Sequence, residues 1–375
     1  MFRIPRSRVH ETHQALRGEI LAALEPLLFG PVSGEGADVR CRLETQFGEA
    51  VGQRYASAVH SGTIAIFIAL RACGVGPGDE VITVANSDIS TTGAISCCGA
   101  VPVLCDILET DYTMNPELVE PLISERTVAL LPVDLHGHPA DVKRLRDIAD
   151  KHNLKIIEDA ALATGACDYG QPVSAFADAC VFSFAPLKPI GCVGSGGIVT
   201  TNDEAIAERL RYLAGYGHSP EKHPTPGYQN YVAEGYHVPL DPLQAALVSI
   251  KLPYLSKWTE KRRSIVKTYT EGLTGSSAIL PSFREVSQPT FRSYTIRVPD
   301  QQRIYQALRE AGIEVVLHYA PPIYDYNVYK NRMLDAEALP VTNQIAKELL
   351  SLPVTVELSD DDVEYVLETL RTQLE

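Results

Sequence analysis

The sequence predicts an α/β protein in which a large domain, built on a mainly parallel mixed sheet, precedes a smaller C-terminal α+β domain. First, short apolar strands alternate with helical patterns over the first two hundred residues, which is typical of βα units whose sheet is covered on both faces. Second, the chain has 375 residues, of which 45% are hydrophobic and 21% charged, a globular composition that favours about two domains. We therefore predict a large domain over 1–255 and a small domain over 256–375.

In the large domain each short apolar run is expected to form a strand and each longer periodic run a helix. The expected strands are 55–62, 80–84, 101–107, 127–135, 154–160, 179–184 and 196–201, and the expected helices are 63–74, 86–98, 115–123 and 139–152. Ligands of such folds bind beyond the carboxyl ends of the strands. The functional site is therefore expected among the residues that follow these strands.

A segment rich in Gly, Pro, Tyr and His, residues 215–241, separates the two parts of the chain. It is too long and too aromatic for a simple connector, so we expect it to be ordered and functional. A long helical region over 242–270 follows it and carries the predicted domain boundary. The expected strands of the C-terminal part are 293–298 and 314–320, and its expected helices are 301–312, 341–352 and 359–372.

Charge and composition exclude several classes of partner. The net charge of −14 argues against nucleic acid or an anionic membrane, because both attract a positive face. The N-terminal residues lack the apolar core of a signal peptide, and no apolar run approaches the length of a membrane span. The eight cysteines show no CxxC pair and no zinc spacing, so we expect reduced, packed cysteines in a cytoplasmic protein.

Lys188 is the first candidate for chemistry. It stands between two prolines and ahead of four glycines in "FSFAPLKPIGCVGSGG". Pro189 disfavours helical geometry at Lys188, and the glycines allow the backbone to approach a ligand closely. Most lysines are solvated surface residues, but a lysine held in this way suits attack on an aldehyde.

Two further stretches follow strands. Asp159 in "IIEDAA" could pair with a protonated ring nitrogen, or it could cap a helix. His60 to Thr63, "HSGT", combine helix-start amides with hydroxyl groups and so could bind an anion, with a plain helix cap as the alternative. Ser183 adds a hydroxyl near Lys188. An anion cradle, a partner for a ring nitrogen and an aldehyde-binding lysine are together what pyridoxal phosphate requires.

Eight motifs follow one another along the chain: "SGTIAIFIALRACGVGPGDEVIT", "GAVPVLCDI", "LHGHPADV", "IIEDAA", "FSFAPLK", "GSGGIVTTND", "DPLQAAL" and "LSLPV". Their order, from about Phe29 to Arg371, resembles the DegT/DnrJ/EryC1/StrS family of sugar aminotransferases. The resemblance implies the type I aminotransferase fold. It also implies a homodimer with two active sites at the subunit interface.

The resemblance further implies roles for individual residues. Gly62, Thr63 and Ser183 are expected to bind the phosphate of pyridoxal 5'-phosphate, Asp159 to face its ring nitrogen, and Lys188 to form the covalent bond to its aldehyde. We expect glutamate or glutamine as amino donor, and as acceptor a keto sugar, nucleotide-linked, or a ketocyclitol. In a ping-pong cycle Lys188 would move the proton of the donor's α-carbon.

Several positions depart from the family pattern. Asp88 replaces an aromatic residue that stacks on the cofactor, and Leu162 replaces a glutamine or histidine. Two further changes fall in a motif that the neighbouring subunit donates. His237 replaces an asparagine expected near the phosphate, and Pro239 replaces an arginine. One interpretation is a different set of contacts for an unusual substrate, in which Asp88 takes a proton or binds the substrate. Elimination or oxidation of an aminated sugar, or a non-catalytic cofactor-binding regulator, are the alternatives, but the retained Lys188 favours transamination.

Other histidines receive weaker assignments. His218 in the long loop and His318 in "LHYAPP" are candidates for substrate contact. His136 and His138 form "HGH", whose spacing could suggest a metal, but this stretch resembles a strand-end loop of the family, so we predict no metal site. Cys192 is expected to pack and not to act as a nucleophile.

Overall fold

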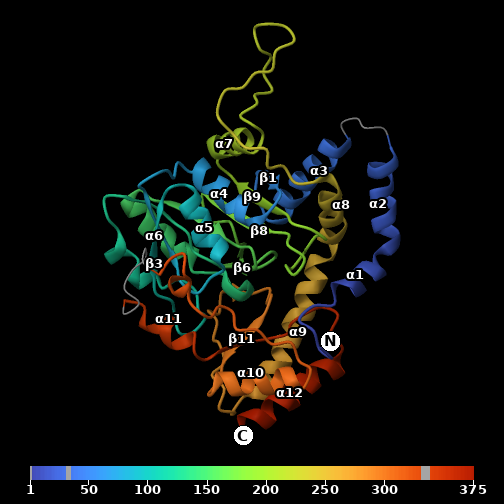
Figure 1. Ribbon diagram of the computed structural model, residues 1–375, viewed down its shortest axis with the longest axis vertical. Coiled ribbons are helices and arrows are strands. Elements are labelled where there is room, and N and C mark those ends of the chain that lie inside the picture. The colour runs from blue at the N-terminus through green and yellow to red at the C-terminus, as the bar shows by residue number, and fades with distance from the viewer. Residues whose placement is uncertain (1, 31–34, 331–337) are drawn as a thin grey trace.

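A seven-stranded sheet forms the centre of the molecule in the computed structural model, which describes residues 2–30, 35–330 and 338–375 (Figure 1). Its strands lie in the order β1 (Tyr55–Val59), β9 (Gly197–Thr201), β8 (Ala179–Ser183), β5 (Lys155–Asp159), β4 (Thr127–Leu130), β2 (Glu80–Val84) and β3 (Val101–Cys105). The last five of these pair in parallel, while β9 lies antiparallel between β1 and β8. The predicted mainly parallel mixed sheet is therefore confirmed.

Helices cover both faces of this sheet, because neighbouring residues of a strand point to opposite faces. Val181 of β8 packs in one core with α4 (Gly62–Ala72), α5 (Ile89–Cys97) and α7 (Glu204–Ala214). Its neighbours Cys180 and Phe182 pack on the other face, with α3 (Glu35–Ala50) and α8 (Pro242–Lys251). α6 (Val142–His152) extends that second layer over β2, β4 and β5.

Side-chain caps explain where several of these helices begin. Asp141, Asp203 and Asp241 accept hydrogen bonds from the first-turn amides of α6, α7 and α8, which satisfies donors that the helix itself leaves unpaired. Gly74 follows α4 with φ +95°, a backbone conformation that glycine adopts without strain. The predicted end of that helix at Gly74 agrees with this turn.

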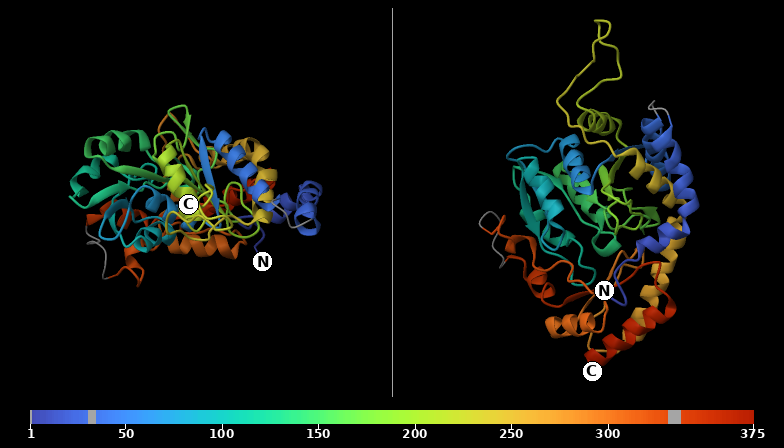
Figure 2. Two further views of the ribbon diagram at one scale, coloured as in Figure 1. Left: turned by 90° about the horizontal axis from the view of Figure 1, so that it is seen from above. Right: turned by 45° about the vertical axis from the view of Figure 1, so that its right-hand side comes forward.

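A second core lies at the C-terminal end of the molecule. It joins α9 (Leu255–Leu273), α10 (Gln301–Glu310) and α12 (Asp360–Leu374) to an antiparallel pair of strands, β11 (Tyr294–Arg297) and β12 (Leu349–Leu352). Figure 2 shows α9 running from the sheet to these helices. Ile4 also packs in this core, where it forms a β-bridge with Ile313. The division near residue 255 stays a prediction.

The remaining elements are short or peripheral. They are α1 (Val9–Ala15), α2 (Arg17–Phe29), α11 (Pro340–Ile345), β6 (Cys167–Asp168), β7 (Gln171–Pro172), β10 (Ser287–Gln288), η3 (Leu135–Gly137) and η5 (Ile323–Asp325). None of the helices in the described part of the chain combines the length and the apolar character that crossing a membrane requires.

Two predicted helices are interrupted at prolines. The stretch 115–123 forms two 3₁₀ turns, η1 (Pro116–Leu118) and η2 (Glu120–Leu122), instead of one α-helix. The region 242–270 is divided by η4 (Leu252–Tyr254) into α8 and α9. In both places a proline lacks the N–H that a continuous α-helix would use.

Two stretches of the C-terminal part also differ from the prediction. Residues 314–320 form no extended strand: only Val316 bridges Ser351, and the segment then turns toward the site described below. The predicted helix 341–352 ends at Ile345, and Leu349–Leu352 form β12. Pairing of β12 with β11 and burial of its four residues outweigh local helix propensity there.

The segment 215–241 leaves the body of the molecule beside α7 and projects from it as a long loop (Figure 1). Large side chains on this loop are open to solvent, with Tyr228 68% and Tyr231 59% exposed. The loop is thus available for contact with another molecule.

Candidate active site

The ends of β1 and β8 meet at the start of α4. A β-carbon built on Gly62 would lie 2.9 Å from both Cβ and Oγ of Ser183, so the helix start and the strand end touch at a position where only glycine fits. Ser61 Oγ accepts a hydrogen bond of 3.2 Å from the Ile64 amide. The amides of Gly62 and Thr63, ahead of it, have no partner within the helix and can bind an anion there.

Asp159 ends β5 and lies at the same edge of the sheet. Its side chain is buried, with 4% exposed, and each carboxylate oxygen has one donor. Thr91 Oγ1 donates to Oδ2 at 3.0 Å, and the Ala161 amide donates to Oδ1 at 3.2 Å. Burial raises the pKa of Asp159, while Lys188 and these donors lower it. The carboxylate can therefore face a positively charged ring nitrogen.

Lys188 is held in a tight loop between β8 and β9. Its amide donates to Ala185 O at 2.9 Å, and the Cys192 amide donates to Phe184 O at 2.8 Å. A β-carbon on Gly191 would lie 2.5 Å from Ala185 O, so the loop closes on itself only with glycine at that position. These backbone contacts fix the point from which the lysine side chain leaves the sheet.

Burial lowers the pKa of Lys188 to about 8. The carboxylate of Asp159 raises this pKa and the guanidinium of Arg292 lowers it. A lysine with such a pKa is neutral in an appreciable fraction of molecules near neutral pH, which nucleophilic attack and proton transfer both require.

Asp88 lies at the exposed start of α5. Its Oδ1 accepts a hydrogen bond of 2.9 Å from the Ser90 amide, so it caps the helix. Its negative charge also opposes the lowering of the pKa values of Lys188 and His318 that burial causes. Asp88 therefore combines a structural role with a position near the lysine.

His318 comes from the segment 314–320, which crosses from the second core to the lysine. Burial lowers its pKa to about 3, and Arg292, Arg6 and Lys188 contribute in the same direction. The imidazole is therefore neutral at physiological pH and can accept or donate a hydrogen bond. Its neighbour Tyr319 has a pKa raised by burial and by Asp88.

His218 and His237 lie elsewhere in the chain. They line a cavity of about 820 Å³ at the base of the projecting loop, with Arg40 and Arg211. His237 stacks on Tyr216, with ring centres 4.8 Å apart. A single chain therefore does not bring these two histidines to Lys188.

Other side chains named from the sequence have structural partners. His136 Nδ1 lies within hydrogen-bond distance of Ser293 and Thr295, and His138 pairs with Asp111. Within the described ranges no three metal-ligating side chains gather. Cys192 is buried in the core behind the loop, and burial raises its pKa, which suits packing. Leu162 uses its carbonyl, which accepts from Thr290 Oγ1 at 3.2 Å.

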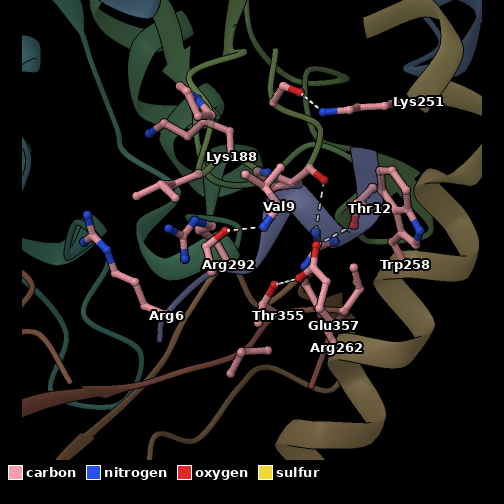
Figure 3. Close-up of a pocket in the computed structure, with 17 residues that line it drawn as sticks. Arg6, Val9, Thr12, Lys188, Lys251, Trp258, Arg262, Arg292, Thr355 and Glu357 are labelled. Atoms are coloured by element: carbon pink, nitrogen blue, oxygen red, sulfur yellow. Dashed lines mark hydrogen bonds between the residues drawn. The ribbon is translucent and has the colours of Figure 1, made fainter. Parts of the chain in front are cut away.

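Three arginines near Lys188 were not predicted. Arg6 precedes α1, Arg262 lies in α9 and Arg292 precedes β11, and all three line a cavity together with Lys188 (Figure 3). They are separated from Lys188 by about 70 to 180 residues of sequence, so no local pattern relates them to it. The one available signal in the sequence was the charged residue Arg292 in the stretch that leads into β11.

The geometry fits pyridoxal phosphate. Gly62 and Ser183 close around a helix start suited to a phosphate, Asp159 offers a buried carboxylate, and Lys188 has an amine that loses its proton readily. All four residues follow β1, β5 or β8 at one edge of the sheet.

Comparison with known proteins points in the same direction. The sequence model of the DegT/DnrJ/EryC1/StrS aminotransferase family matches residues 16–371. A pleiotropic regulatory protein of Geobacillus stearothermophilus is 35% identical over 370 residues, covering 98% of this chain and 97% of that protein. A dTDP-3-amino-3,4,6-trideoxy-alpha-D-glucose transaminase of Streptomyces venezuelae is also 35% identical, covering 98% and 96%.

The fold is equally similar to a solved structure. The crystal structure of S. venezuelae DesV in complex with a ketimine intermediate superposes with a TM-score of 0.93 at 35% identity. The match covers 100% of this chain and 99% of that one.

Proposed function

Since this chain belongs to the DegT/DnrJ/EryC1/StrS aminotransferase family, we propose that it transfers an amino group from glutamate or glutamine to a nucleotide-linked keto sugar. It is a pyridoxal-phosphate-dependent aminotransferase. The observation that carries the proposal is the position of Lys188, Asp159 and the Gly62–Ser183 contact at the carboxyl ends of neighbouring strands. A relative that is a dTDP-sugar transaminase supports the nucleotide-linked acceptor, with a ketocyclitol as the alternative acceptor.

We assign the cofactor contacts as follows. The amides of Gly62 and Thr63, with the hydroxyl of Ser183, would bind the phosphate, and Lys188 would hold the aldehyde carbon. When bound, pyridoxal phosphate supplies an aldehyde that links to amines and a ring that withdraws electrons from the adjoining carbon. Asp159 would keep a proton on the ring nitrogen, which strengthens that withdrawal.

Lys188 is the proton carrier in this proposal. Its neutral amine would take the proton from the α-carbon of the donor and return it to the former aldehyde carbon, on the other side of the nitrogen that joins the two carbons. Near pH 8 the lysine exists in both protonation states, so it can accept a proton and release it in the same turnover. Thr91 and the Ala161 amide keep the Asp159 carboxylate in place during this transfer.

A homodimer would complete the site. His218 and His237, both in the segment 215–241, line a cavity that Lys188 does not line, so their proposed contacts with phosphate and substrate require a second subunit. The exposed aromatic side chains of the loop support a protein contact there. The eight free cysteines support a reducing compartment, the cytoplasm.

The test is to add glutamate to the holoenzyme and to follow its visible absorption. We expect the band of the lysine-bound cofactor to disappear and about one equivalent of 2-oxoglutarate per subunit to form, as in a ping-pong half-reaction. Lys188→Ala should show neither change. A ketone panel added to the aminated enzyme would then identify the acceptor.

The alternatives give different results in the same experiment. If no amino donor changes the spectrum, the proposal fails and the chain is a cofactor-binding regulator, for which the regulatory protein of G. stearothermophilus is a precedent in name. If an aminated sugar causes release of ammonia or consumption of oxygen, Asp88 takes part in elimination or oxidation.

A further inference from the structure

A small cavity lined by cations lies beside Lys188. It is bounded by the Lys188 loop, the N-terminal segment, α9 and residues 354–357, and has a volume of about 40 Å³ (Figure 3). Its charged lining residues are Arg6, Lys188, Lys251, Arg262, Arg292 and Glu357. Five cationic side chains and one carboxylate thus line the cavity, in a protein whose net charge is −14. We call this site the cation-lined cavity.

Some of these charges are compensated within the chain. Both carboxylate oxygens of Glu357 accept hydrogen bonds, from Thr12 and Thr355. Lys251 donates to Gly191 O, and Arg6 lies 3.7 Å from a carboxylate oxygen of Glu314. Glu357, Lys251 and Arg6 therefore already have partners within the chain and do not require a ligand.

Neither Arg262 nor Arg292 forms an ion pair with a residue that the structure describes, although the charge of Glu357 acts to raise the pKa of Arg262. The Arg262 side chain is buried, with 6% of the residue exposed; Nη2 donates to Pro189 O at 3.0 Å, while Nη1 has no hydrogen-bond partner. The guanidinium of Arg292 forms no hydrogen bond or ion pair with any residue that the structure describes. Burial lowers the pKa of each to about 10, with repulsion between the two contributing to that of Arg262. A buried cationic group without a partner, such as Arg262 Nη1, is strongly unfavourable in a folded protein. The half-buried, unpaired guanidinium of Arg292 lies near enough to repel it, and the two together point to an anionic ligand.

The size and position of the cavity select among anions. A volume of about 40 Å³ accommodates a carboxylate but not a sugar or a nucleotide. A planar guanidinium binds a carboxylate through two parallel hydrogen bonds. The cofactor phosphate already has a cradle at Gly62 and Ser183. An amino acid donor carries its carboxylate on the carbon from which Lys188 would take the proton, so that group must lie close to Lys188.

We propose that Arg292, supported by Arg262, binds a carboxylate of the amino donor in the cation-lined cavity. This inference rests on the proposed function and names the group by which the site recognises its donor. It makes Arg292 a specificity residue: amines without a carboxylate are poor donors, because they would leave both guanidinium groups unpaired.

Glutarate, which has the carboxylates of glutamate but no amine, tests this by isothermal titration calorimetry of the holoenzyme. Arg292→Gln should weaken glutarate binding by about tenfold to a hundredfold, the equivalent of losing charge-assisted hydrogen bonds. Arg292→Lys should fall between wild type and Arg292→Gln, since lysine keeps the charge without the planar fork. Lys257→Gln is the matched control, because Lys257 is exposed on α9. This variant should bind glutarate with the affinity of wild type.

Folding is checked separately. Arg292→Gln breaks no side-chain bond of the described chain, so its melting temperature without glutarate should be no lower than that of wild type. At the same glutarate concentration, the melting temperature should rise less in Arg292→Gln than in wild type. In donor kinetics the variant should need a higher glutamate concentration for half-maximal rate, with a smaller change in the limiting rate.

Three outcomes decide between the ideas. Unchanged glutarate affinity in Arg292→Gln, while glutamate still converts the holoenzyme, would overturn the carboxylate site and leave the aminotransferase assignment intact. Glutarate binding that depends on Arg292, in an enzyme that no donor converts, would support the site and refute the assignment. Inorganic phosphate that binds more tightly than glutarate and displaces it would also overturn the carboxylate site.

Discussion

A lysine in water loses its proton at a pH of about 10.4, whereas burial in this fold lowers the pKa of Lys188 to about 8. Burial lowers the pKa of the lysine, while the carboxylate of Asp159 limits the shift. A lysine is neutral above its pKa, so the reactive fraction of Lys188 grows as the pH rises through about 8.

The first prediction concerns this titration. The rate at which the cofactor-free protein forms a borohydride-reducible bond with pyridoxal phosphate should increase with pH, with a midpoint near 8. Stopped-flow absorbance measures the rate, and Lys188→Arg should abolish the bond. A midpoint near that of an exposed lysine would contradict the burial that the structure shows.

Asp159 depends on a neighbour that the sequence did not identify. Thr91 donates a hydrogen bond of 3.0 Å to its Oδ2 and lies 2.9 Å from Ser87 Oγ. The carboxylate is thus oriented by α5, the helix that Asp88 caps.

The second prediction separates charge from orientation. Asp159→Asn removes the negative charge, so the glutamate half-reaction should slow by about 100-fold or more, as when one preorganised electrostatic group is lost. Thr91→Val keeps the charge and should slow it by no more than about tenfold. Equal effects of the two changes on the single-turnover rate would mean that the carboxylate charge is not what matters.

At the scale of elements, the site depends on the contact between the start of α4 and the end of β8. Gly62 permits this contact, because any side chain there would meet Ser183 at 2.9 Å. The antiparallel pair β8–β9 then places Lys188 in a loop whose two ends are held by the pairing of Ser183 with Gly197.

The third prediction uses two glycines of neighbouring helices. Gly62→Ala should push α4 away from Ser183 and weaken cofactor binding by about tenfold or more, because the Cβ that it would meet at 2.9 Å is attached directly to the backbone of β8 and cannot move freely. Gly93→Ala in the middle of α5 meets no atom within 4 Å and should stabilise the protein by up to about 1 kcal/mol. Fluorescence titration with pyridoxal phosphate and thermal unfolding measure these effects. Normal cofactor affinity in Gly62→Ala would show that the phosphate lies elsewhere.

At the scale of the whole molecule, the residues proposed for the site occupy two separate places. Lys188 and Asp159 lie at the sheet edge, while His218 and His237 lie at the base of the projecting loop. A homodimer in which the loop of one subunit reaches the other would join them, as proposed above.

The fourth prediction is complementation between two inactive variants. Lys188→Ala lacks the amine. A loop variant with His237→Ala and Tyr231→Ala is expected to lack the contacts that the loop of one subunit makes with the site of the other. Mixed and reassociated, they should recover about a quarter of wild-type activity, since half of the dimers are mixed and each has one intact site. Analytical ultracentrifugation checks the dimer. No recovery in a mixture shown to contain mixed dimers would mean that each subunit works alone.

The sequence by itself determined the class of fold and singled out the local part of the proposed site. The alternation of strands and helices indicated a mainly parallel sheet. Gly62, Asp159, Ser183 and Lys188 could be proposed for the site because each ends or follows a strand. Parallel strands bring their carboxyl ends to one edge, so position along the chain was sufficient information for these residues.

Only the tertiary structure decided the rest. Arg6, Arg262 and Arg292 come from three distant segments and reach the lysine because α9 and the second core fold back against the sheet. Local pattern also failed at 341–352, where pairing with β11 turned part of a predicted helix into β12. The physical reason is the same in both cases: burial and strand pairing join residues far apart in the chain, and no local pattern encodes which ones meet.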